Sequence, residues 1–145
     1  MKTLLISKCL LGENVRYDGG NCLLRSDYLS RLKHHYKLVP ICPELMAGFT
    51  IPREPIERSG GKIISKSGKD VTAQFNDTLE SIKALVIEHN VNRALLKDFS
   101  PSCGVNMIYD GSFSGEKIKG QGLITEVLTS LGVNVFGEDE IEQLL

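Results

Sequence analysis

The sequence of 145 residues contains no apolar stretch approaching the ~18 consecutive residues of a membrane-spanning helix. It also lacks an excess of either charge, because 17 Lys and Arg residues against 18 Asp and Glu residues give a net charge of -1. This balance argues against a general affinity for polyanions, so we do not expect nucleic acid as a partner. No Cys-x-x-Cys sequence is present, which argues against a thioredoxin-like dithiol and against a zinc ribbon.

The first residues do not fit a secretory signal peptide. Lys8 interrupts the apolar run at residues 3–6, which is therefore shorter than the ~7–15 residues of a signal-peptide core. We expect a cytoplasmic protein in which this run forms a buried first strand. In that reducing compartment, the four cysteines are better explained as metal ligands or reactive thiols than as a disulfide framework.

The length fits a single domain, residues 1–145, that can bury a core without covalent staples. Apolar runs predict strands at about 2–7, 36–41, 92–97 and 133–136. Helical spacing of apolar residues predicts helices at about 24–35, 122–131 and 138–145, and another that Asp70 or Thr72 caps and that ends at about 89. Strands alternating with helices predict an α/β fold with a mainly parallel sheet and helices on its faces.

Some segments interrupt this alternation. Glycines on both sides of residues 62–66 predict a small inserted β-ribbon with a tight turn. Residues 45–55 are expected to be irregular, residues 106–109 to add a short strand, and residues 112–122 to form a loop. Residues 10–21 predict another loop, which exceeds the usual ~2–6 residues of a strand-to-helix connection; long loops in compact domains are usually functional.

Three cysteines each follow one of the predicted strands: Cys9 the first, Cys42 the second and Cys103 the third. In an open parallel sheet, the carboxyl ends of the strands are where ligands bind. If these strands are parallel neighbours, three sulfur atoms meet at one edge of the sheet. A single free cysteine is often only a small buried hydrophobic residue, but three cysteines at successive strand ends indicate a shared site.

Two kinds of cofactor suit three dispersed thiolates. One is a zinc ion with a fourth ligand or an open position. The other is an iron–sulfur cluster held by three cysteines, which leaves one iron free to bind something else. Cys22, just after the Gly19-Gly20 turn, is either a fourth ligand or a spare thiol in the loop, and the residues alone leave these alternatives open.

Glu44 stands two residues after Cys42, past a proline that fixes the turn. A carboxylate beside a metal site can act as a general acid or base, whereas an ordinary glutamate would lie on the surface. Ser100 and Ser102 flank a proline just before Cys103. They either form hydrogen bonds to a ligand or cap the segment that follows, the usual task of serine in turns.

Two further segments each have two interpretations. Arg16-Tyr17-Asp18 either orients a substrate or holds its own loop. Gly120-Gln121-Gly122, just before a predicted helix, either presents backbone N–H groups to an anion or closes a loop, and the second is favoured because an isolated Gly-x-Gly is a weak anion signal.

Six short segments occur in this order along the chain: Cys9-Leu10-Leu11-Gly12, Arg16-Tyr17-Asp18-Gly19, Cys42-Pro43-Glu44, Asp70-Val71-Thr72, Ser100-Pro101-Ser102-Cys103-Gly104 and Gly120-Gln121-Gly122. Together they resemble the thiouracil desulfidase family of bacteria, along essentially the whole chain. The resemblance implies a Rossmann-like three-layer α/β domain and an oxygen-sensitive [4Fe-4S] cluster held by Cys9, Cys42 and Cys103. It also implies that Glu44 and Ser100 are catalytic. Cys22 lies outside these segments, which weakens its case as a ligand.

The function implied by the resemblance is hydrolytic removal of sulfur from thiolated nucleobases such as 2-thiouracil, with release of hydrogen sulfide. The iron without a cysteine would polarise the thiocarbonyl group, and Glu44 would serve as base or proton donor for attack by water. One alternative is a non-catalytic module in which the cluster senses oxygen or the thiols hold zinc. Another is a desulfidase for thiolated nucleosides in tRNA, against which the net charge of -1 and the small size argue.

Overall fold

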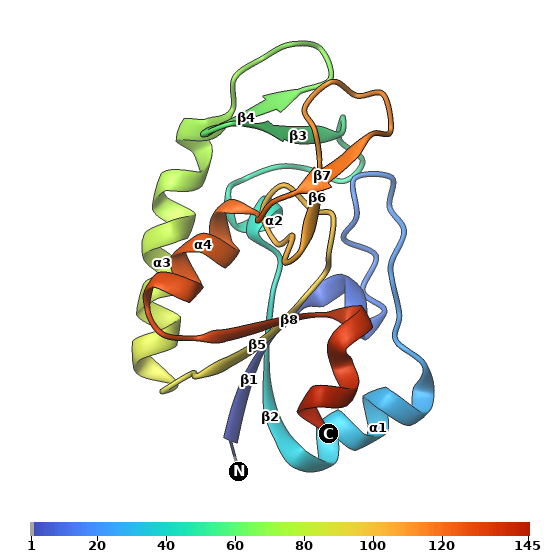
Figure 1. Cartoon of the computed structure of the whole chain (residues 1–145), viewed down its shortest axis with the longest axis vertical. Coiled ribbons are helices and arrows are strands. Elements are labelled where there is room, and N and C mark those ends of the chain that lie inside the picture. The colour runs from blue at the N-terminus through green and yellow to red at the C-terminus, as the bar shows by residue number, and fades with distance from the viewer. Residues whose placement is uncertain (1) are drawn as a thin grey trace.

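A parallel four-stranded sheet forms the centre of the computed structural model, which describes residues 2–145 (Figure 1). Its strand order is β2-β1-β5-β8, with bounds β1 (Lys2–Ser7), β2 (Tyr36–Ile41), β5 (Arg93–Leu96) and β8 (Asn134–Gly137). Leu4 pairs with Leu38 of β2 on one side and with Arg93 of β5 on the other. The strands that precede the three cysteines are therefore adjacent, with β1 between β2 and β5.

Successive side chains of a strand point to opposite faces of the sheet, and the strands carry apolar side chains on both faces. Helices cover both faces and bury these side chains. On one face lie α3 (Asn76–Glu88) and α4 (Leu123–Ser130); on the other lie α1 (Ser26–His35) and the 3-10 helix η3 (Glu138–Leu144). The first face buries Leu5, Ala94, Leu96, Ile82, Ile124 and Leu128. The second buries Leu4, Ile6, Leu95, Leu32, Ile141 and Leu144. This three-layer α/β arrangement confirms the predicted fold class.

Local signals set the helix ends. The Asp70 carboxylate accepts the backbone N–H of Thr72 at 3.0 Å, at the start of the 3-10 helix η2 (Thr72–Phe75) that leads into α3. Asn90 after α3 and Gly132 after α4 have φ values of 50° and 82°. These left-handed residues end the helices where the sequence predicted.

Two antiparallel hairpins lie outside the central sheet. The first, β3 (Ile56–Ser59) with β4 (Lys62–Ser65), is the predicted ribbon. The second pairs β6 (Met107–Tyr109) with β7 (Lys117–Lys119), so the prediction of an uninterrupted loop at 112–122 was wrong. All three residues of β7 are exposed, and so β7 lacks the alternating burial pattern by which a strand is recognised.

Short helices were also missed. Pro43 opens the one-turn helix α2 (Pro43–Met46), which overlaps the segment predicted to be irregular, because proline is favoured at the first helical position. The 3-10 helix η1 (Lys8–Leu11) follows β1 directly. Throughout 2–145, no helix combines the length and the apolar character needed to cross a membrane.

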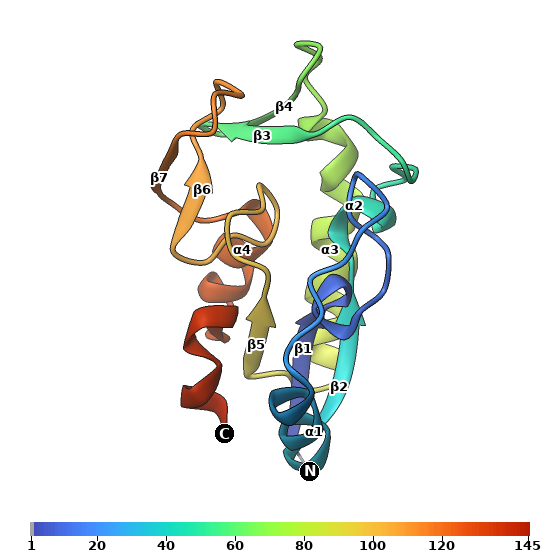
Figure 2. The same ribbon diagram turned by 90° about the vertical axis from the view of Figure 1, so that its right-hand side faces the viewer.

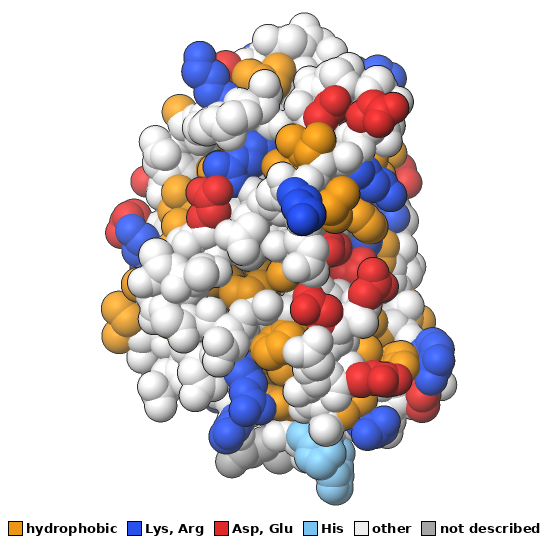
Figure 3. Space-filling view, viewed as in Figure 1, with side chains coloured by type: hydrophobic (Ala, Val, Ile, Leu, Met, Phe, Trp, Pro, Cys, Tyr) orange, Lys and Arg blue, Asp and Glu red, His pale blue; other side chains and the backbone are white. Residues whose placement is uncertain are grey.

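The carboxyl ends of β1, β2 and β5 point toward the two hairpins. Figure 2 shows the β3–β4 ribbon lying across this end of the molecule, with β6 and β7 rising toward it on one side and the segment after β1 rising on the other. On the face drawn in Figure 3, basic and acidic side chains are interspersed rather than gathered by sign. The hairpins thus enclose the end of the sheet at which the sequence places the cysteines.

Candidate functional site

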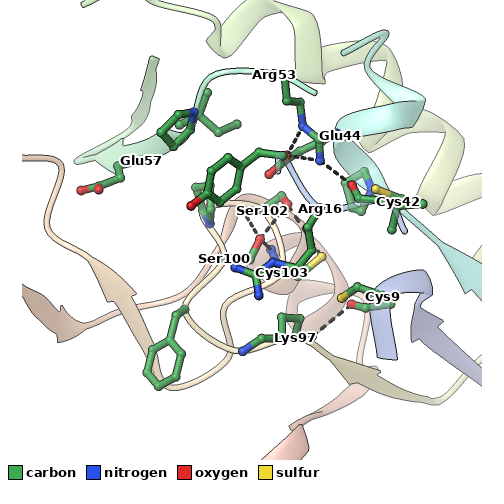
Figure 4. A pocket seen from close by; sticks show the side chains of 18 of the residues that line it. Cys9, Arg16, Cys42, Glu44, Arg53, Glu57, Lys97, Ser100, Ser102 and Cys103 are labelled. Atoms are coloured by element: carbon green, nitrogen blue, oxygen red, sulfur yellow. Dashed lines mark hydrogen bonds and ion pairs between the residues drawn. The ribbon is translucent and has the colours of Figure 1, made fainter. Parts of the chain in front are cut away.

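A cavity of about 480 Å³ lies at the carboxyl ends of β1, β2 and β5. Cys9, Cys42 and Cys103 all line it, together with Glu44 and Ser100 (Figure 4). The structure therefore brings together all five residues that the sequence selected as ligands or catalysts. Its volume falls within the ~300–1,000 Å³ typical of small-molecule sites.

The loop that carries Cys103 is built around a buried carboxylate, that of Asp98. Its Oδ1 atom accepts four backbone N–H groups at 2.9–3.2 Å, those of Phe99, Val105, Asn106 and Met107. Burial acts to raise the pKa of Asp98, but the N–H groups outweigh it and the pKa is lowered. An ionised aspartate thus fixes the fold of the loop.

Ser100 caps the turn that presents Cys103. Its Oγ atom accepts the backbone N–H groups of Ser102 at 3.2 Å and Cys103 at 3.1 Å. The two serine hydroxyls lie 3.1 Å apart, and that of Ser102 donates to the Cys103 sulfur at 3.7 Å. Because the Ser102 hydrogen goes to the sulfur, the Ser100 hydroxyl is the donor to Ser102 Oγ. Ser100 therefore has the capping role and also lines the cavity.

The Gly120-Gln121-Gly122 segment closes the structure behind the Cys103 loop. The N–H groups of Gly122 and Ile124 donate to the carbonyls of Gly104 and Ser102 at 2.8 and 2.9 Å. A Cβ at position 122 would lie 2.3 Å from the Ser102 carbonyl carbon, so only glycine fits. The N–H group of Gly120 likewise donates to the Asn106 carbonyl, so the structure favours loop closure over anion binding.

Glu44 lies in the first turn of α2 and is held by Arg53, a residue that the sequence analysis did not select. The Nε and Nη2 atoms of Arg53 both contact Oε2 of Glu44, at 2.8 and 2.7 Å. The same guanidinium donates to the carbonyls of Val15 and Thr50. Both side chains of the pair are largely buried, with 6% of Arg53 and 15% of Glu44 exposed. No hydrogen bond from residues 2–145 reaches Oε1 of Glu44, which leaves that oxygen for a ligand.

The loop after Cys9 divides its tasks between neighbouring residues. Arg16 and Tyr17 line the cavity, whereas the Asp18 carboxylate accepts the N–H of Gly20 and so holds the turn. Cys22 does not line the cavity; its sulfur accepts a hydrogen bond from Arg16 at 3.3 Å. The structure therefore favours Cys22 as a support for the loop over a fourth ligand.

The three cavity thiols fit a cofactor with several metal atoms. No group of three His, Cys, Asp or Glu side chains in the described chain is close enough to hold one ion. A tetrahedral zinc site, with Zn–S bonds of ~2.3 Å, would need sulfur atoms within ~4 Å of one another. In an iron–sulfur cluster each thiolate binds a different iron, so the sulfur atoms stand farther apart. Three cysteines that line one cavity are thus a donor set suited to such a cluster.

Burial of the three thiols favours their protonated form. Burial raises the pKa of Cys103 to about 12, and burial is also the main cause of the raised pKa values of Cys9 and Cys42. Neutral thiols are weak nucleophiles, so these residues are poor candidates for reactive thiols in the metal-free chain. Binding of a metal would release their protons.

Four aromatic side chains are among the residues that line the cavity. The lining includes Tyr17 from the loop after Cys9, Phe99 from the Cys103 loop, and Tyr109 and Phe113 from the β6–β7 hairpin. Planar apolar walls of this kind suit a flat heteroaromatic ring, which can stack on them. The cavity thus combines sulfur donors at one end with an aromatic enclosure suited to a nucleobase.

Comparison with known proteins identifies relatives along nearly the whole chain. Residues 4–140 match the family model described as 2-thiouracil desulfurase. "Uncharacterized protein YbbK" of Bacillus subtilis (strain 168) is 38% identical over 152 residues, which cover 98% of this chain and 99% of YbbK. A solved structure described as the [4Fe-4S]-dependent thiouracil desulfidase TudS matches with a TM-score of 0.94 at 39% identity, covering 99% of this chain and 95% of that one.

Proposed function

Because the chain belongs to the 2-thiouracil desulfurase family, we propose that it is a [4Fe-4S]-dependent hydrolytic desulfidase for thiolated nucleobases such as 2-thiouracil. The observation that carries this proposal is that Cys9, Cys42, Cys103 and Glu44 line one cavity of about 480 Å³. The reaction replaces the thiocarbonyl sulfur with an oxygen from water and releases hydrogen sulfide, with no net transfer of electrons.

Cys9, Cys42 and Cys103 would hold the cluster through three of its irons. When bound, the cluster supplies an iron without a protein ligand, which serves as a Lewis acid for the sulfur of a thiocarbonyl group. The three cysteines follow three adjacent strands. The Asp98 carboxylate and the Gly122 backbone hold the loop that carries Cys103 in place. The fold thus prepares the ligand set without help from Cys22.

Glu44 is the residue that moves protons. With Oε2 held by Arg53, Oε1 is available to take a proton from the water that attacks the ring carbon. The same carboxylate then returns that proton to the leaving sulfur or to a ring nitrogen, as a general acid. When the substrate binds, the Ser100 hydroxyl turns from Ser102 Oγ and donates its hydrogen to a polar atom of the ring, and the aromatic side chains exclude bulk water.

A free nucleobase in the cytoplasm, rather than a nucleoside within tRNA, is the substrate we favour. The net charge of -1 and the interspersed surface charges in Figure 3 support this choice, because binding of RNA relies on a basic surface. Thiolated tRNA therefore serves as the competing substrate in the test below.

The test begins with anaerobic purification and a count of iron and acid-labile sulfide. The loaded protein is then incubated with 2-thiouracil, and we expect equal amounts of uracil and sulfide. Glu44→Gln should keep the visible absorbance of the cluster and lose about 10²–10⁴-fold in turnover, whereas Glu54→Gln, an exposed carboxylate outside the cavity, serves as the matched control.

Five results would contradict the proposal or one of its parts. If the purified protein is colourless and contains zinc, the cofactor is not an iron–sulfur cluster. If it contains the cluster but releases no sulfide, the protein is a sensor rather than an enzyme. Release of sulfide from thiolated tRNA but not from free 2-thiouracil would show that the substrate is the nucleoside in tRNA. Full activity of Glu44→Gln would remove Glu44 from the mechanism, and an intact cluster in Cys103→Ser would overturn the ligand set.

A further inference from the structure

We propose that Glu57 holds the turn between β6 and β7, residues 110–116, over the cavity, as a latch would. We call this turn the roof, and we propose that it limits the size of the substrate. The inference rests on the desulfidase function proposed above. Glu57 has a positioning role here, because its carboxylate binds the turn rather than the reacting atoms.

Glu57 is a buried carboxylate whose contacts are with one turn of the chain. It lies on β3, is 9% exposed and lines the cavity. Its Oε1 atom accepts the backbone N–H groups of Gly111 at 3.0 Å and Phe113 at 3.2 Å. No lysine or arginine within 2–145 forms an ion pair with it. A buried carboxylate needs hydrogen-bond or charged partners, and here the two backbone N–H groups of the turn are those partners. The two hydrogen bonds therefore tie the ribbon to the turn.

Gly111 brings the backbone of the turn directly onto the ribbon. Its φ of 93° is a left-handed conformation that favours glycine. A Cβ at this position would lie 2.9 Å from the Cβ of Ser59 and 3.1 Å from the carbonyl oxygen of Arg58. The turn is therefore packed against β3 at the residue whose N–H donates to Glu57.

Phe113 is the residue that this latch presents to the cavity. Its φ of 57° is rare for a bulky aromatic residue, and such a conformation persists only where the surroundings hold it. Glu57 binds its N–H, and the Asp110 carboxylate accepts the N–H of Ser112 just before it. Phe113 and Tyr109, on the same hairpin, both line the cavity.

The roof is remote from the sulfur ligands. Figure 2 shows the ribbon bridging the cavity end of the molecule, and Figure 4 shows Glu57 well separated from Cys9 and Cys42 across the site. A substrate whose thiocarbonyl group reaches the cysteine end therefore presents its opposite edge, with any substituent at C5 or C6 of the ring, to the roof. The contacts of Glu57 therefore determine which rings fit into the cavity, and Glu57 takes no part in breaking the C–S bond.

The experiment compares Glu57→Ala with Glu57→Gln in protein loaded to equal iron content. Alanine removes the acceptor, whereas glutamine keeps an amide oxygen that can accept both N–H groups without the charge. In the alanine variant we expect amide exchange at residues 111–113 to rise about tenfold or more. We expect its preference in kcat/KM for 2-thiouracil over 6-propyl- and 6-benzyl-2-thiouracil to fall about tenfold. The glutamine variant should match the wild type in both measurements.

Two more variants sharpen the comparison. Glu54→Ala removes an exposed carboxylate, bonded to Ser67, from the segment just before β3 and is the matched control. Gly111→Ala loosens the turn from its own side and should reproduce the effects of Glu57→Ala, which keeps the test decisive if the latter fails to fold.

Several outcomes would overturn the inference. A glutamine variant as impaired as the alanine variant would show that the charge of Glu57 matters, not its hydrogen bonds to the turn. Unchanged exchange in Glu57→Ala and Gly111→Ala would refute the latch, and faster exchange with unchanged preference would refute the roof. If the wild-type protein desulfurates no thiopyrimidine, the proposed function and the size limit both fall, while amide exchange still decides whether Glu57 holds the turn.

Discussion

Replacing Arg53 with alanine would remove the only charged partner that Glu44 has within residues 2–145. The guanidinium contacts one carboxylate oxygen with two nitrogen atoms and also binds two backbone carbonyls, those of Val15 and Thr50. These contacts join α2, the loop after Cys9 and the segment before β3. The substitution should therefore affect both the stability of the fold and the position of the carboxylate that we propose to be catalytic.

The burial of the pair sets the size of the effect. With 6% and 15% of the two side chains exposed, solvent screens the pair little. Removing one partner of a buried ion pair costs about 3–5 kcal/mol, since the other is left without compensation. For a chain of this length, such a loss lowers the unfolding temperature by about 10–20 °C. Misplacement of a catalytic group by about 1 Å lowers kcat about 100-fold.

The assay measures thermal unfolding, iron content and sulfide release for Arg53→Ala and Arg53→Lys. We expect intact cluster absorbance, a KM near that of the wild type and the loss in kcat just given. Lysine should rescue only part of it, because an ammonium group cannot reach the same three acceptors at once. Arg25→Ala, which removes an exposed pair with Asp27, should leave kcat unchanged. Wild-type kcat and stability in Arg53→Ala would refute the reasoning.

Three further predictions concern the cysteine loops. Gly122→Ala should lower iron content and the unfolding temperature, because the added Cβ meets Ser102 backbone atoms at 2.3 Å; Gly61→Ala, where a Cβ meets nothing within 4 Å, should change neither. The pKa of Asp98 is lowered in the folded chain, so its contribution to stability is present above the unfolded value of ~3.9 and is lost as the pH falls toward the folded value. In urea unfolding, Asp98→Asn should thus be less stable than the wild type at pH 7, by a margin that shrinks at about pH 3. Cys22→Ser should keep its full iron content, and loss of the cluster there would make Cys22 a ligand.

The central fold could be predicted because burial dominates it. The runs that became β1, β2 and β5 are apolar and end at turns, and the rule for the carboxyl ends of parallel strands then placed the cysteines together. The strand β7 escaped prediction because Lys117-Ile118-Lys119 is exposed and is a strand only through its pairing with β6. Pairing between exposed segments leaves little pattern in a single sequence.

The sequence predicted the cysteines of the candidate site, but only a part of the residues that hold the site in place. Arg53 and Glu57 were missed because each acts through a contact with a distant segment: Glu44 for the first and the turn at 111–113 for the second. Neither position carries a local pattern. Asp98 had one usable signal, a carboxylate directly after a buried strand, but only the structure shows that four amides converge on it.

The carbonyls of the Cys103 loop are bound by Gly122 and the first amides of α4, so Cys103, a proposed ligand, is held by a stretch of chain made after it. A nascent polypeptide that stops short of residue 122 already carries all four cysteines yet lacks the surface that seats the last of them. Iron delivery should accordingly wait until translation has passed α4 and the sheet has closed. Assembly of the metal centre then reports on completed folding, which gives the cell a chain that becomes active only once it is whole.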